Sequence, residues 1–146
     1  MSHFVGEVSE HAVIYNADDN ILLLRHTWEH LKGKWHLPGG RMDAKDTPGQ
    51  GLLRELREET GLTGVELIMP CHASRWGAAK PVVKYSIAYL AKVQGTPKVI
   101  LPPDEDHDLA EWVAVEEALG RTFTFPELAD VIRGVHVWAK RLGVVE

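Results

Sequence analysis

Three glutamates lie within one short segment near the middle of the chain, Arg54-Glu55-Leu56-Arg57-Glu58-Glu59-Thr60-Gly61. On an α-helix, which turns by roughly 100° per residue, Glu55, Glu58 and Glu59 fall within an arc of about 100°. The next arc is apolar, and its residues are Leu52, Leu53 and Leu56. We therefore expect the three carboxylates beside the buried face of a helix, not opposite it.

These carboxylates are well suited to bind a hard cation. Glu55 and Glu59 are one helical turn apart, and like charges at this spacing cost a few tenths of a kcal/mol. Mg²⁺ would neutralise them, since it binds oxygen ligands and usually keeps waters and substrate phosphates. The segment alone leaves a second interpretation open, a solvated charged helix in which Arg54 pairs with Glu58.

The helix has predicted limits on both sides. Thr47-Pro48-Gly49-Gln50 has the form of a capping box, with Thr47 at the N-cap and Pro48 at the first helical position. The helix should run to about Thr60, and Gly61 should end it.

The residues before the helix favour the metal site over the solvated charged helix. Gly40, five residues, Asp46, seven residues and then the segment from Arg54 to Leu62 strongly resemble the signature of the Nudix hydrolases. Two other segments are similar to the family outside its signature, Trp35-His36-Leu37-Pro38-Gly39 and Ala110-Glu111-Trp112-Val113.

The resemblance implies hydrolysis of a nucleoside diphosphate linked to another group, with Mg²⁺ or Mn²⁺ as cofactor. It makes Glu58 and Glu59 the principal metal ligands, with the Gly40 carbonyl. Glu55, also near the metal, would orient or deprotonate the attacking water, and Arg54 would position Glu55. Carboxylates hold the metal, which lowers the pKa of a bound water, and a nearby carboxylate takes the proton.

Two acids depart from the family pattern. Asp46 stands where the family usually has Glu, so it would work through water or serve mainly as a helix-start residue. Asp106, six residues before Trp112, matches a loop acid of the family but is again shorter than Glu. We expect Asp106 to be catalytic. Glu105 could supply the longer reach, and a merely solvated acidic turn is the alternative.

Three further residues are candidates for substrate binding. Arg25 and Arg75 could bind phosphate, and Trp76 could stack on a base. A surface arginine and a packing tryptophan are the alternatives for Arg25 and Trp76. Trp28 and Trp35 are expected to be packing residues.

Strands are predicted over residues 11–15, 21–25, 65–73, 82–93 and 111–115, the first two as a hairpin. Pro38-Gly39-Gly40 should break any strand, and residues 102–108 should form a loop. Thr124-Phe125-Pro126-Glu127 repeats the capping pattern for a helix from about Pro126 to Leu142. Its apolar stripe is Leu128, Val131, Ile132, Val135 and Leu142. This order predicts a mixed α/β sandwich, and the resemblance makes it a Nudix-like α/β/α sandwich, one domain over residues 1–146.

Composition limits the partners. A formal charge of −5 argues against binding of long nucleic acid, which requires a basic surface. No apolar run reaches the roughly 18 residues of a membrane span. The single cysteine, Cys71, fits the reducing cytoplasm. We expect a small nucleotide-type substrate and a monomer or homodimer.

A nucleoside triphosphate pyrophosphatase is the leading prediction, because no long extension is present to build a tailored pocket. Hydrolysis of ADP-ribose, of another nucleotide sugar or of a dinucleoside polyphosphate is the alternative. A different class, a catalytically weak nucleotide-sensing domain, is supported only by the changes at Asp46 and Asp106.

Overall fold

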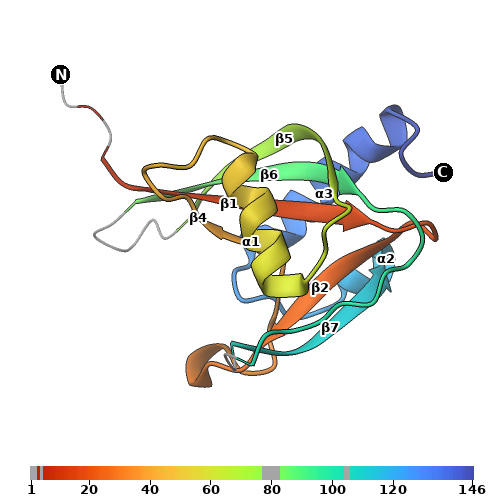
Figure 1. The fold of residues 1–146 in the computed structure, drawn as a ribbon, viewed down its shortest axis with the longest axis horizontal. Helices are drawn as coiled ribbons and strands as arrows, with labels where there is room; N and C mark the ends of the chain where they lie inside the picture. Colours follow the sequence, from red (N-terminus) through yellow and green to blue (C-terminus); the bar gives the residue numbers. More distant parts are fainter. Residues whose placement is uncertain (1–2, 4, 77–82, 104–105) are drawn as a thin grey trace.

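The computed structural model describes residues 3, 5–76, 83–103 and 106–146. Figure 1 shows a mixed sheet with helices on both sides. Along the chain the elements are β1 (Glu7–Tyr15), β2 (Asn20–His26), the 3₁₀ turn η1 (Glu29–Leu31), β3 (Trp35–His36), β4 (Gly39–Arg41), α1 (Gln50–Thr60), β5 (Glu66–Trp76), β6 (Lys84–Lys92), β7 (His107–Ala114), α2 (Val115–Leu119) and α3 (Glu127–Arg141).

Strand β1 is the centre of the sheet, whose main order is β3-β2-β1-β6-β5. It pairs in parallel with β6 along its whole length, and the other strand pairs are antiparallel. Its other edge is shared, because Ser9 to His11 pair with β4 while Tyr15 pairs with Ile21 of β2. Strand β7 pairs with β2. This division leaves β4, with Gly40, directly beside β1.

The two faces of β1 pack against different helices. Ala12 and Ile14 lie in a core cluster with Leu52 and Leu56 of α1. Val13 and Tyr15 point the other way, into a cluster with the buried face of α3. Successive side chains of a strand alternate between faces, so a strand buried on both sides has a continuous apolar sequence. Helices α1 and α3 thus cover opposite faces (Figure 1), and the predicted α/β/α sandwich with a mixed sheet is confirmed.

The predicted hairpin, the strands around residues 65–73 and 82–93 and the last helix are confirmed, with shifts at their ends. Residue 82 of the second strand lies outside the described residues. The loop prediction over residues 102–108 is wrong at its end, because β7 begins at His107 and is longer than predicted, and residues 104 and 105 lie outside the described residues. Helix α2 was not predicted. Pro38 does interrupt the chain between β3 and β4, but Gly39 and Gly40 themselves lie in β4.

Three other local predictions are wrong. Leu142 is 49% exposed, because it lies beyond the last residue of α3, and Leu53 is 38% exposed, on the edge of α1 that the sheet does not cover. Thr124 does not cap α3, since its hydroxyl is hydrogen-bonded to Nδ1 of His36 at 2.6 Å. Among the described residues, no helix is both long and apolar enough to cross a membrane.

Candidate active site

Helix α1 begins two residues later than predicted, and its start is held by a strand. The N-cap is Gly49, with φ of +83°, and the Thr47 hydroxyl contacts the Gln50 side chain instead of a backbone N–H. The Gly49 N–H donates to the buried Glu10 carboxylate of β1, 3.2 Å from Oε2. The capping-box prediction is therefore wrong, because a distant acid takes the place of the cap. The predicted stop at Gly61 is confirmed, with φ of +72° and its N–H bonded to the Arg57 carbonyl at 2.9 Å.

Glu10 was not predicted, although a glutamate inside an apolar strand is a signal that sequence reasoning could have used. It is almost fully buried, and it is also hydrogen-bonded to the Tyr89 hydroxyl. Burial and this neighbouring carboxylate raise the pKa of Tyr89 to about 12, so the phenol stays protonated and can donate. Glu10 therefore fixes the start of α1 relative to the sheet.

Gly40 lies against the carboxylate of Glu55. A Cβ at position 40 would lie 3.1 Å from both Cδ and Oε2 of Glu55, so the glycine leaves room for the acid to approach the backbone. Burial raises the pKa of Glu55, while the neighbouring Arg54 lowers it. A carboxylate with a raised pKa is a better proton acceptor at neutral pH.

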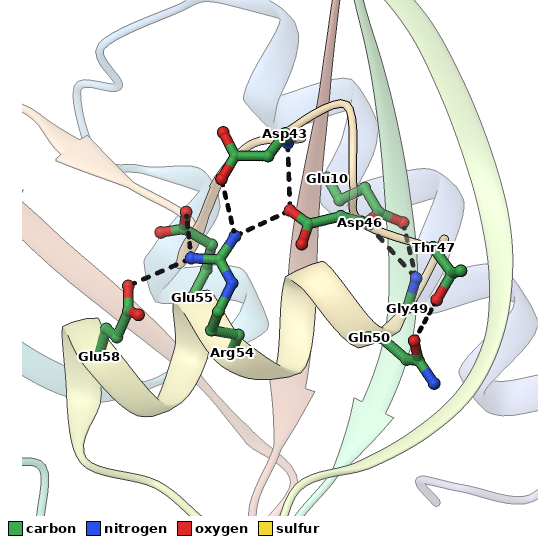
Figure 2. A network of polar contacts seen from close by, with 9 residues as sticks. All are labelled: Glu10, Asp43, Asp46, Thr47, Gly49, Gln50, Arg54, Glu55 and Glu58. Carbon is green, nitrogen blue, oxygen red and sulfur yellow. Dashed lines mark hydrogen bonds and ion pairs between the residues drawn. The ribbon is translucent and has the colours of Figure 1, made fainter.

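Arg54 is surrounded by acids (Figure 2). Its Nη2 lies 2.8 Å from Oδ2 of Asp46 and 3.6 Å from Oδ2 of Asp43. Its Nη1 lies 3.6 Å from Oε1 of Glu55 and 3.5 Å from Oε2 of Glu58. The structure therefore contains both the predicted contact between Arg54 and Glu55 and the Arg54–Glu58 pair of the alternative interpretation.

Asp46 holds the loop before α1 together. Its Oδ2 accepts the Asp43 N–H at 3.1 Å as well as Arg54, and these two bonds lower the pKa of Asp46. A Cβ at Gly51 would come within 2.8 Å of the same oxygen, so the carboxylate lies directly on the first turn of the helix. Asp46 therefore packs against the first turn of α1 but does not cap the helix.

Of the remaining two glutamates, Glu59 is half-buried and Glu58 is exposed. Oε1 of Glu59 accepts the Gly39 N–H at 2.8 Å, which turns this carboxylate toward the glycine pair. The Glu58 side chain is 59% exposed. Together with Glu55 and the Gly40 carbonyl, these are the hard oxygen donors that Mg²⁺ or Mn²⁺ prefers, so the residues fit such an ion. In the described part of the chain, however, no three acidic, histidine or cysteine side chains are already arranged around one point. A bound ion would have to compete with Arg54 for Glu55 and Glu58.

A cleft of about 280 Å³ opens beside Gly39, Gly40 and Glu59. Two cations line it, Arg41 and Lys84, and both are paired with Glu7, at 3.0 and 3.5 Å. Neither cation was predicted; Arg41 directly follows Gly40 and could have been found, whereas Lys84 is placed by the parallel pairing of β6 with β1. The other residues that line the cleft are Ser9, His11, His26, Trp28, Leu31, His36, Trp76, Asp106, His107 and Phe125.

His11 and His36, which line the cleft, belong to a chain of hydrogen bonds between buried and half-buried side chains. Nδ1 of His11 is 3.0 Å from the Ser86 hydroxyl, and its Nε2 is 3.1 Å from Nε2 of His36. The other nitrogen of His36 reaches Thr124. Burial lowers the pKa of His11 to about 4 and that of His36 well below its usual range, so both rings are neutral at pH 7.

The predicted substrate-binding residues do not converge. Trp76 is only 2% exposed and lies between His11 and Phe125, with ring centroids 5.3 and 4.9 Å away. Both ring faces are covered, so the prediction that a base stacks on Trp76 does not fit its placement. Arg25 forms two 2.9 Å hydrogen bonds with Asp108, and Arg75 is exposed on the opposite side of β5 from Trp76. Neither arginine is among the described residues that line the cleft.

The two loop acids have different outcomes. Asp106 lines the cleft, and its Oδ1 accepts the indole N–H of Trp28 at 2.8 Å. Glu105 lies outside the described residues.

A helix of carboxylates lies beside a glycine backbone and a cleft with two cations, and these groups together suit a metal ion and a phosphate chain. Comparison with known proteins agrees, since the family model described as NUDIX domain matches residues 8–134. The chain therefore belongs to the Nudix family.

Three relatives show how far the likeness extends. The putative nudix hydrolase 1 of Caenorhabditis elegans is 29% identical to this chain, and the match covers 68% of this chain. The same match covers only 26% of the length of that protein. The 8-oxo-dGTP diphosphatase of Proteus vulgaris is 39% identical over 34% of this chain and 46% of its own length. The crystal structure of the MutT protein from Methanosarcina mazei Go1 has a TM-score of 0.72 and 28% identity, and the likeness covers 92% of this chain and 95% of that one.

Proposed function

We propose that residues 1–146 form one Nudix hydrolase domain that cleaves a diphosphate linkage in a nucleoside diphosphate derivative with Mg²⁺ or Mn²⁺. Within this class we propose a nucleoside triphosphate pyrophosphatase. The observation that carries the proposal is the position of Gly40, with its backbone against Glu55 and its neighbour Gly39 bonded to Glu59. Carboxylates held against a glycine backbone beside a cleft give a diphosphate and its metal a common site.

Each site residue has a proposed part in the reaction. Glu58, Glu59 and the Gly40 carbonyl, with Glu55 nearby, would hold the metal, which supplies charge neutralisation and a water of lowered pKa. Glu55 takes the proton of the attacking water, and its partial burial favours this role.

The remaining charged groups position the reactants. Arg54 holds Glu55, and Asp46 in turn holds Arg54 through the 2.8 Å pair. Arg41 and Lys84 bind phosphate oxygens at the edge of the cleft, where they now share Glu7. Roles for Arg25 and Arg75 stay predictions, since neither lines the cleft.

One relative favours a nucleoside triphosphate over the larger alternatives. The 8-oxo-dGTP diphosphatase of Proteus vulgaris, whose name gives a triphosphate as its substrate, is 39% identical to this chain over 51 residues. The cleft of about 280 Å³ adjoins a second one of about 550 Å³, since Gly40 and Arg41 line both, and Glu55 lines the second. We further propose a cytoplasmic location, for which the single cysteine, Cys71, is the support. A monomer or homodimer stays a prediction.

A substrate panel tests the proposal. The purified protein would be incubated with Mg²⁺ and, separately, the standard deoxynucleoside and nucleoside triphosphates, 8-oxo-dGTP, ADP-ribose and diadenosine tetraphosphate. We expect a triphosphate to give the nucleoside monophosphate and pyrophosphate with the highest kcat/KM. We also expect EDTA to abolish turnover and excess Mg²⁺ or Mn²⁺ to restore it. No turnover of any substrate, together with tight binding of one, would instead identify a nucleotide-sensing domain.

A further inference from the structure

Trp28 is an exposed aromatic residue beside the hydrolytic site. It lies between β2 and η1, its side chain is 48% exposed, and it lines the same cleft as Gly40 and Glu59. Its ring meets His26 edge-on, with centroids 5.2 Å apart and planes at 68°. The ring of His30 lies 6.1 Å from it at 38°. Neither contact buries the indole, since about half of the surface of Trp28 stays exposed.

Asp106 fixes the orientation of this indole. Its carboxylate accepts the Trp28 indole N–H at 2.8 Å, and its backbone carbonyl accepts the Thr27 N–H at 3.1 Å. Two bonds from one residue therefore tie both Thr27 and Trp28 to the segment before β7. An aromatic surface that is already oriented loses little entropy when a ligand binds.

Other aromatic residues that line the cleft offer a ligand much less. Trp76 is covered on both faces, and its indole N–H donates to Ser74 at 2.7 Å. All four ring nitrogens of His11 and His36 are engaged in the buried chain from Ser86 to Thr124. Among the described aromatic side chains that line the cleft, Trp28 is the exposed one, and the others are buried or half-buried.

We propose that the base of the nucleotide stacks on Trp28, and that Asp106 is the positioning residue that holds the indole in place. This inference rests on the proposed function, because it assigns the base end of the substrate whose phosphates lie at Gly40 and Arg41. Stacking is largely independent of base identity, so the cleft accepts several bases with similar affinity.

Steady-state kinetics with the best substrate of the panel tests the stacking. Base–aromatic stacking is worth about 1–3 kcal/mol, so Trp28→Ala should raise KM roughly 5- to 150-fold with little change in kcat. Trp28→Phe should recover most of the affinity because it keeps a flat ring. Trp138→Ala, on the exposed side of α3, is the matched control and should leave KM unchanged. An unchanged KM in Trp28→Ala would overturn the proposal.

Asp106 variants separate positioning from catalysis. An asparagine oxygen still accepts the indole N–H, so Asp106→Asn should raise KM only a few fold. Asp106→Ala should raise KM as Trp28→Ala does, and the double variant should be no worse than Trp28→Ala, because both remove one interaction. A fall in kcat of two orders or more in Asp106→Asn would show that Asp106 is a ligand or base, against our assignment.

A binding measurement distinguishes failure of this inference from failure of the proposed function. GMP, AMP, CMP and UMP would be titrated calorimetrically into the wild-type protein and Trp28→Ala without metal. We expect all four to bind the wild type within about tenfold of one another and to bind the variant more weakly. Equal binding to both proteins would refute the stacking even if the hydrolase is active, and lost binding with no turnover would refute only the hydrolase.

Discussion

The carboxylate of Glu59 has two interactions that bear on metal binding, a hydrogen bond and a repulsion between like charges. It accepts the Gly39 N–H at 2.8 Å, and it lies one helical turn from Glu55, where like charges repel. A metal ion relieves this repulsion, whereas the hydrogen bond to Gly39 requires only an oxygen. A glutamine at position 59 therefore removes the charge and keeps an oxygen that can accept the hydrogen bond.

We predict that Glu59→Gln lowers kcat by about two orders of magnitude or more with Mg²⁺, because it removes a charged metal ligand. The amide oxygen can still accept the Gly39 N–H, and one like-charge pair is lost, so the melting temperature should stay equal or rise slightly. Glu66→Gln, the same change at an exposed position of β5, is the matched control. Near-wild-type activity of Glu59→Gln would contradict the metal assignment.

Asp46 shows what a single substitution in the family pattern means physically. The sequence marks it as shorter than the usual glutamate but leaves its partner open. The structure places its carboxylate on Gly51 and in contact with Arg54, so a short acid suffices because the helix carries no side chain there. The partner was unpredictable because the packing of the loop against the first turn is tertiary information.

At the scale of elements, the end of α1 was predictable and its beginning was not. Gly61 ends the helix by its own backbone freedom, which is a local property. The start is held by Glu10, which is 39 residues away from Gly49 in the chain. The same contrast applies to α3, where the buried stripe from Leu128 to Val135 follows from periodicity but Thr124 is taken by His36.

Strand β4 approaches the backbone of β1 closely at Gly39. Gly39 has φ of +145°, and a Cβ there would overlap the Glu10 carbonyl oxygen and lie 2.8 Å from the His11 Cα. Gly39→Ala should therefore destabilise the protein by about 2 kcal/mol or more and reduce activity, because Gly40 moves with β4.

Urea unfolding at pH 7.5 checks this, with Gly64→Ala as the control, since a Cβ at Gly64 meets nothing within 4 Å. A Gly39→Ala protein as stable as the wild type would show that β4 need not approach β1 so closely.

At the scale of the whole molecule, two hydrogen-bonded histidines join parts of the chain that are far apart in sequence. His11 of β1 and His36 of β3 link Ser86 of β6 to Thr124 before α3. The histidines are spread along the sequence, and only the parallel pairing of β1 with β6 and the return of the chain past β3 bring them together. Their connection is a property of the topology and of no local pattern.

These histidines should make the fold sensitive to mild acid. Burial lowers the pKa of His11 and of His26 to about 4, and it also lowers the pKa values of His36 and His136. In the unfolded chain these groups bind protons near pH 6.5, so the unfolded state takes up more protons below that pH. Stability should therefore be complete above pH 6.5 and fall as the pH decreases toward 4. His11 alone accounts for about 2 kcal/mol of the loss at pH 5.

Urea unfolding followed by circular dichroism at pH 7.5, 6.5, 5.5 and 5.0 measures this slope. Glu55 acts in the opposite direction, because burial raises its pKa, but it is one group against several histidines. His11→Gln should reduce the slope between pH 6.5 and 5.0, whereas His3→Gln, at an exposed position, should not. A free energy of unfolding that stays constant from pH 7.5 to 5.0 would mean that the histidines are protonated in the folded protein as readily as in the unfolded chain. The buried chain from Ser86 to Thr124 would then not exist in solution.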